Sequence, residues 1–213
     1  MTIPYNATKS SSWTYVREAL VEQGFEPTKD QVTMVVNAIY LSMDAIVPGP
    51  MRVMRWIKTQ VGQYIRSGAD HIEWTTPSGF VVNQKRNKKE VECMKLQLMG
   101  STKVTVSVGE GDPCPTRHKS STAPNLIHSV DASILHETFQ RFNGPFTVIH
   151  DSVLCRATDM ATLNRLVRET YTDIFTRDCW LTKFGEVINA TEPPPIVGTL
   201  NPEVVESSTY FFC

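Results

Sequence analysis

Three patterns that would each point to a class of protein are not seen in this sequence: an excess of one charge, a membrane-length apolar run and a signal-peptide pattern in the first residues. Its 213 residues include 21 Lys and Arg against 22 Asp and Glu, a formal net charge of −1. The net charge therefore gives no indication of a nucleic-acid partner. No apolar run is long enough for a membrane, and the first residues do not resemble a signal peptide. We expect a soluble cytoplasmic protein with no membrane partner.

The cysteines and histidines lack the spacing of a disulfide framework or a zinc site. The cysteines are odd in number, widely spaced and without a Cys-x-x-Cys pair; they stand at positions 93, 114, 155, 179 and 213. The histidines, at positions 71, 118, 128, 136 and 150, show no metal-ligand spacing. These patterns predict reduced thiols in a cytosolic setting.

One stretch departs from the even balance of charge. From Lys85 to Lys119 there are eight Lys or Arg residues and four Asp or Glu residues, a local excess of four positive charges. Such an excess is suited to phosphate contacts. A solvated surface is an equally good interpretation of any one of these residues.

Hydrophobic periodicity predicts an α+β chain that begins with helices. The predicted helices cover about residues 13–24, 28–47 and 51–65, the last two separated by Pro48-Gly49-Pro50, and we expect them to form one layer. Residues 72–76 and 80–84 flank a Pro-Ser-Gly turn and predict a β-hairpin. Residues 91–98 and 103–108 are weaker strand candidates, and 109–115, rich in Gly and Pro, predict a loop or insert. Further helices are predicted from Asn125 and from a cap at Thr158 or Asp159.

The stretch from Phe146 to Arg156 carries the clearest chemical signal. Apolar β-formers flank a polar centre, His150-Asp151-Ser152, which predicts two strands joined by a tight turn with the Asp at its tip. A carboxylate held there faces out of the sheet, as a metal ligand does. The alternative is an ordinary hairpin turn, because Asp and Ser favour turns by hydrogen-bonding nearby backbone.

Two further motifs accompany this turn. Ala123-Pro124-Asn125 begins a segment that continues to His128-Ser129-Val130-Asp131, and the hairpin from Trp74 to Phe80 reads Trp-Thr-Thr-Pro-Ser-Gly-Phe. Together with the His-Asp-Ser turn they resemble the carboxy-terminal half of the single-subunit RNA polymerases of bacteriophages and mitochondria. The resemblance implies a hand-like fold, with helices on a small antiparallel sheet and the catalytic Asp at a hairpin turn. It implies a fingers-like portion over residues 1–70 and a palm-like portion over 71–213.

The resemblance also implies roles for individual residues. Asp151 matches the family's second catalytic carboxylate and magnesium ligand, with His150 and Ser152 as supporting neighbours. His128 and Tyr5 match residues that contact the ribose of the nucleotide, and Arg117 and Lys119 stand where phosphate contacts are expected. A polar helix-face histidine is the alternative for His128. The role of Tyr5 is open because Pro4 and Asn6 depart from the family pattern.

Other residues that the family needs are not found in this sequence. Nucleotidyl transfer uses two Mg²⁺ ions, and the family's first catalytic Asp and its triphosphate-binding Arg and Lys would precede Met1. Asp151 alone should hold Mg²⁺ weakly. We therefore expect this chain to be inactive alone and to need an upstream polymerase segment or a second chain, together with a DNA template, an RNA product and ribonucleoside triphosphates.

Two alternatives to an RNA polymerase remain open at this point. The first is a non-catalytic remnant that binds nucleic acid or a polymerase. The second is a DNA polymerase of the same architecture, although there the residue after His-Asp is usually Glu rather than Ser152. Since nothing resembles a transit peptide, we favour a phage protein in the host cytoplasm over a mitochondrial one.

Overall fold

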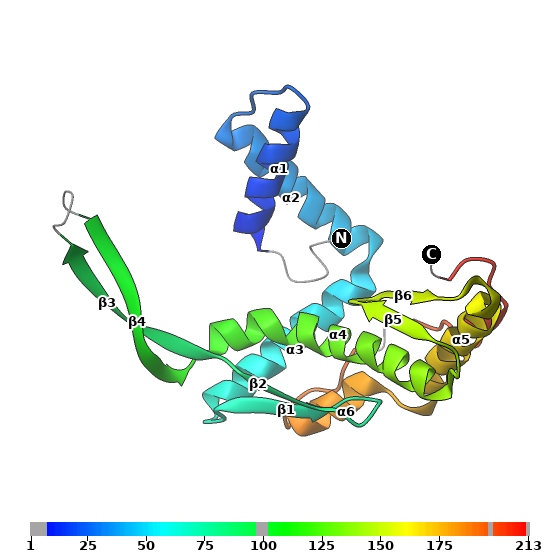
Figure 1. Ribbon diagram of the computed structural model, residues 1–213. Helices are drawn as coiled ribbons and strands as arrows, with labels where there is room; N and C mark the ends of the chain where they lie inside the picture. The colour runs from blue at the N-terminus through cyan, green and yellow to red at the C-terminus, as the bar shows by residue number, and fades with distance from the viewer. Residues whose placement is uncertain (1–7, 97–101, 196–197, 212–213) are drawn as a thin grey trace.

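The computed structural model describes residues 8–96, 102–195 and 198–211 (Figure 1). Within them the chain is α+β, as predicted, with helices and antiparallel strand pairs. The strands form three separate two-stranded sheets, β1–β2, β3–β4 and β5–β6, and not one small sheet. The helices, above all α4, connect these hairpins, which places the functional side chains on helix faces and at hairpin ends.

The first two helices are confirmed and form a helical hairpin. α1 spans Lys9–Glu22 and α2 spans Lys29–Ile46. Thr28 caps α2 in a capping box with Gln31, in which each side chain accepts from the other residue's backbone N–H. The hairpin projects from the rest of the molecule (Figure 1).

The third helix shows that the expectation of a single helical layer is wrong. α3 spans Pro48–Arg66, and its axis is bent 103° from that of α2. The prolines start α3, because a proline in the first turn needs no hydrogen-bonded N–H. α3 turns away from α1 and α2 and packs beside α4 (Figure 1).

α3 supplies much of the larger core. It packs with β1 (His71–Thr75), β2 (Val81–Lys85) and α6 (Trp180–Val187). The β1–β2 hairpin is confirmed as predicted. The buried apolar side chains are Met54, Trp56, Ile57, Val61, Ile65, Ile72, Trp74, Ala123, Leu126, Phe184 and Ile188. Burial of such side chains is the main favourable term in folding, so this cluster fixes α4 against α3.

The β3–β4 hairpin is longer than predicted. β3 spans Asn87–Leu96 and β4 spans Thr102–Pro113, so the loop expected over residues 109–115 is wrong. Glu110 pairs with Lys89 and Gly109 with Glu90, next to two register shifts. Glycine is tolerated at such irregularities. The hairpin extends away from the helical body (Figure 1).

α4 begins ten residues before the predicted start at Asn125. It spans Pro115–Arg141 and contains Pro124, which cannot donate a backbone hydrogen bond. The helix continues through Pro124 because its first half is held by packing: Ala123 and Thr122 are fully buried. A proline that suggested a helix start is thus an interior residue.

A smaller core surrounds α5 (Met160–Arg177), the helix predicted after Asp159; it follows the short η1 (Ala157–Asp159). Asp159 stands at the N-cap position, but its side chain makes no capping hydrogen bond and accepts from Arg156 instead. The buried residues of this core are Phe142, Leu163, Leu166 and Val167. Arg168 of α5 donates to the carbonyls of Val205 and Ser208, which attaches α7 (Val204–Ser207). Among the described helices none is by itself long and apolar enough to cross a membrane; the bent pair α2–α3 passes that test only jointly.

Candidate functional site

The predicted hairpin around Asp151 is confirmed. β5 spans Phe146–Ile149 and β6 spans Ser152–Cys155, and Ile149 pairs directly with Ser152. His150 and Asp151 therefore form a two-residue turn. The φ angle of His150 is 57°, a value that the first position of a tight hairpin turn requires. Asp151 is exposed at the tip of this turn.

Aromatic contacts attach the hairpin to α4. The ring of Phe146 stacks on that of Phe139, with centroids 3.9 Å apart and planes at 5°. Phe142 meets Phe146 edge-on at 6.2 Å. These contacts hold β5 beside the second half of α4, as Figure 1 shows. The orientation of the His150-Asp151 turn is therefore set by α4.

A groove lies between α4 and the hairpin. Its volume is about 560 Å³, and it is lined by Ala132, Leu135, His136, Phe139, Gln140, Phe146, Val148 and His150. The lining is mainly apolar, with two imidazoles. His150 thus faces a cleft, whereas Ser152 begins β6 as an exposed residue. A site that combines a mainly apolar concave wall with a few polar groups is suited to a small-molecule ligand.

α4 presents two exposed polar residues on the part of the helix that includes Asp131, which lies near the turn. His128 and Asp131 are exposed and one helical turn apart. Reduced contact with solvent raises the pKa of Asp131; the His128 imidazole opposes this shift and the Asp151 carboxylate adds to it. The two carboxylates are therefore near enough to interact. Sequence reasoning gave Asp131 no role, although its position three residues after His128 was a usable signal.

The described residues contain no group of three or more His, Cys, Asp or Glu side chains suited to hold a metal. Carboxylate oxygens are nevertheless what Mg²⁺ binds, commonly one or two of them together with substrate phosphates. Asp151 offers such an oxygen donor in an exposed position, and Asp131 adds a second acidic group nearby. The donor chemistry fits Mg²⁺, although these two residues make an incomplete set of ligands.

Other motif residues hold α4 on the β1–β2 hairpin. The Trp74 indole donates to Ser129 Oγ at 3.0 Å, and Asn125 Nδ2 donates to Gln84 Oε1 at 2.7 Å. Gln84 also donates to Thr122 at 2.8 Å. The motif thus has a structural role at Trp74, Asn125 and Ser129 and leaves His128 and Asp131 facing solvent.

His118 completes this buried network. It is fully buried, its Nε2 accepts from the Arg86 N–H at 3.2 Å, and its Nδ1 lies 3.3 Å from the Gln84 amide nitrogen. Burial lowers the pKa of His118, and the charges of Arg86 and His71 lower it further. A neutral imidazole is therefore favoured where β2 meets α4.

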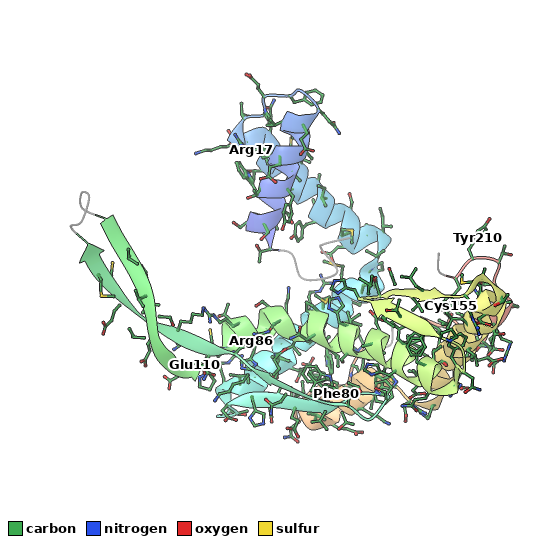
Figure 2. The ribbon with its side chains drawn as sticks, in the orientation of Figure 1. Arg17, Phe80, Arg86, Glu110, Cys155 and Tyr210 are labelled. Carbon is green, nitrogen blue, oxygen red and sulfur yellow. The ribbon has the colours of Figure 1, made fainter. Side chains whose placement is uncertain are left out.

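The two predicted phosphate-binding residues lie near the start of α4. Arg117 donates from Nη1 to the Asn87 carbonyl at 2.9 Å, so part of its guanidinium fixes the base of the β3–β4 hairpin. The Lys119 side chain packs against α3 at Gly62. A Cβ atom at position 62 would lie 2.0 Å from Lys119 Cε, so glycine leaves room for this side chain. Figure 2 shows Arg86 and Glu110 where the β3–β4 hairpin joins the helical body.

The structure thus brings some predicted residues together and separates others. Asp151, His150 and Ser152 share one turn, and His128 lies on the neighbouring helix. Arg117 and Lys119 lie about two to three helical turns before His128 on α4. Tyr5 lies outside the described residues.

Comparison with known proteins gives a family match and several similar proteins. The family model described as DNA-dependent RNA polymerase matches residues 1–193. The DNA-directed RNA polymerase of Pseudomonas phage phiKMV is 27% identical over 221 residues, which cover 100% of this chain and 27% of that protein. The human mitochondrial enzyme is 24% identical over 100% of this chain and 19% of its own length.

T7 RNA polymerase of Escherichia phage T7 is 26% identical over 66% of this chain and 18% of its own length. The chain therefore spans about a quarter or less of these three relatives. The family match nevertheless covers most of this chain. The chain belongs to the DNA-dependent RNA polymerase family, whose members include phage and mitochondrial enzymes.

Proposed function

We propose that this chain forms the part of a DNA-directed RNA polymerase that carries the second catalytic carboxylate, Asp151. The complete enzyme adds ribonucleoside monophosphates to an RNA 3′ end on a DNA template. The observation that carries this proposal is the exposed Asp151 at a two-residue turn, beside the α4 face that bears His128 and Asp131. Family membership supplies the reaction class.

Asp151 is the residue proposed to hold Mg²⁺. When bound, the two metal ions lower the pKa of the attacking 3′-hydroxyl and stabilise the leaving pyrophosphate. Burial raises the pKa of Asp131, and Asp131 and Asp151 together make an incomplete set of ligands for two metal ions. A carboxylate from outside this chain must therefore complete the site.

The remaining assignments rest on the resemblance of the sequence motifs to those of the family. His128, on the exposed face of α4, contacts the ribose of the incoming nucleotide, with Tyr5 as its proposed partner. His150 and Ser152 fix the turn that holds Asp151. Arg117 and Lys119, at the other end of α4, contact nucleic-acid phosphates.

The larger assignments are also proposals. Residues 1–70 are assigned to the fingers and 71–213 to the palm of a hand-like polymerase. The partners are a DNA template, an RNA product, ribonucleoside triphosphates and the polymerase segment or second chain that this chain lacks. A phage relative suggests the host-cell cytoplasm as the place of action.

The test is primer extension by the chain combined with the polypeptide that completes the polymerase, on an RNA–DNA hybrid with Mg²⁺. Asp151→Asn should lower extension by at least about 100-fold, because loss of a direct metal ligand should cost more than loss of a residue that only orients a ligand. The matched control is Asp173→Asn, which alters an exposed α5 carboxylate paired with Arg141. It should leave extension within about twofold, since exposed ion pairs contribute little.

Each other outcome contradicts the proposal. Metal-dependent extension that survives Asp151→Asn would remove the catalytic role of this residue. Absence of metal-dependent extension with every completing polypeptide would favour a nucleic-acid-binding remnant. A preference for deoxynucleotides would favour a DNA polymerase.

A further inference from the structure

α2 is apolar on two opposite faces. Val32 and Val36 lie on one side and are 0% and 3% exposed. Met34 and Leu41 lie on the other side and are 67% and 73% exposed. Ala38 and Ala45, also exposed, fall on the same line as Met34 and Leu41 at spacings of four, three and four residues. We call Met34, Ala38, Leu41 and Ala45 the α2 outer stripe.

α1 covers only the inner face of α2. The Trp13 indole donates to Thr33, Ser12 contacts Tyr40, and these bonds fix α1 along one side. In the described parts of the chain, neither core cluster includes the outer stripe. An exposed apolar stripe bordered by polar side chains commonly marks an interaction site. The apolar side chains of the outer stripe are therefore expected to pack against another polypeptide segment.

The spacing of the residues in the outer stripe indicates that the partner segment is a helix. Apolar residues that alternate at four and three residues form the seam of a helix–helix contact. The alanines at every second position allow a partner helix to approach closely. The bordering polar side chains are already engaged within this chain, because Asp44 pairs with Arg55 at 2.7 Å and Asn37 accepts from Lys9 at 3.0 Å. The seam thus has a polar edge on the side of Asn37 and Asp44.

We propose that the α2 outer stripe binds an apolar helix of the polymerase segment that this chain lacks. The inference rests on the proposed function and names the contact by which that segment docks. The phiKMV relative matches all of this chain with only 27% of its own length, so a large additional polypeptide belongs to a complete enzyme.

The size of the outer stripe distinguishes this occupant from a second copy of the chain. Met34 and Ala45 are about 17 Å apart along the helix axis, at a rise of about 1.5 Å per residue. A stable interface between independent proteins buries on the order of 1,600 Å² in total, far more than four side chains provide. A short seam suits one contact within the larger interface that a completing polymerase segment makes.

Photocrosslinking tests the proposal in the organism that carries the gene. A photoreactive phenylalanine derivative replaces Leu41 in the full chain, and the matched control carries it at Thr14, an exposed position on α1. Mass spectrometry then identifies the peptide attached to each position. We expect position 41 to attach to a peptide whose parent polypeptide carries polymerase sequence beyond that in this chain, and position 14 to give less than about a tenth of that yield.

Four outcomes overturn the proposal. Attachment of position 41 only to another copy of this chain would assign the stripe to self-association. Attachment to lipid would assign it to a membrane surface, and no attachment would leave the stripe exposed in the working protein. Equal yields at positions 41 and 14 would show contact without selectivity for the stripe.

Affinity for the identified segment gives a second measurement. Leu41→Lys should weaken binding about tenfold or more, because a buried leucine contributes at least that factor. Thr14→Lys adds the same charge away from the stripe and should change binding less than about twofold. Unchanged affinity in Leu41→Lys overturns this inference even where primer extension supports the proposed function. A crosslink to the segment without primer extension would support the inference and contradict the function.

Discussion

The attachment of the carboxy-terminal segment to α5 depends on one buried cation. Arg168 is 9% exposed, and its Nη1 donates to the carbonyls of Val205 and Ser208, both at 2.6 Å. Its Nε donates to Asn164, and the guanidinium lies 5.6 Å from the centre of the Phe211 ring. Arg168→Met keeps an unbranched apolar stem and removes every one of these donors.

The expected cost follows from the two bonds to the backbone carbonyls. A hydrogen bond to a charged group is worth about 1.5–3 kcal/mol net. Val205 is buried, and the substituted thioether offers its carbonyl no replacement donor, whereas Ser208 is only half-buried and water can replace part of its bond. The opening free energy of α7 should therefore fall by about 2–4 kcal/mol, which corresponds to an opening constant about 30–700 times larger.

Hydrogen exchange at the amides of α7 measures this opening. The amides of Val205 and Glu206 donate to the carbonyls of Pro202 and Glu203 and report on the local structure. Arg165→Met is the matched control, because Arg165 is exposed on the same helix and pairs with Glu169, away from α7. It should change exchange in α7 less than about twofold. Exchange in Arg168→Met that equals the control would refute the role of Arg168.

Two further predictions concern stability. Because burial lowers the pKa of His118 in the folded chain, the unfolded chain binds its proton first, so stability should fall as pH drops below about 6.5. Urea unfolding at pH values of about 7.5, 6 and 5 should show a steeper loss in the natural chain than in His118→Gln, and equal slopes would contradict this assignment. Ile57→Ala, at a fully buried position of the larger core, should lower the free energy of unfolding by about 2–5 kcal/mol. Ile46→Ala, at a position 77% exposed, should cost less than about 1 kcal/mol, and similar costs for both would disprove the proposed location of the core.

Local signals in the sequence predicted the elements whose determinants are local. α2 and α5 follow from apolar residues at helical spacing, and Thr28 and Asp159 mark their starts. The hairpins at Pro77-Ser78-Gly79 and His150-Asp151 follow from turn chemistry between apolar β-formers. These signals need no information about distant segments.

The errors concern elements that depend on distant partners. α4 passes through Pro124 because Thr122 and Ala123 are buried against other elements, which no local propensity reveals. β4 continues over Gly109 and Gly111 because β3 supplies a strand to pair with. The nearness of Asp131 to Asp151 likewise depends on the stacking of Phe139 on Phe146.

The candidate site was predicted in part for the same reason. The turn around Asp151 and the position of His128 on a helix are local features and are confirmed as structure. The catalytic and binding roles of Asp151, His128, Arg117, Lys119 and Tyr5 stay predictions. Sequence reasoning gave Asp131 no role, because its nearness to Asp151 depends on the packing of two segments.

The length of α4 limits the electrostatic effect that a charge near its start can have on the Asp151 turn. His118 and Asp131 lie on this one helix, about 20 Å apart along its axis. That distance exceeds the screening length of about 8 Å at physiological ionic strength. Protonation of His118 should therefore have little electrostatic effect on the Asp151 turn. Any influence of that charge on the turn would have to pass through the packing of α4, because His118 is buried where this helix meets β2.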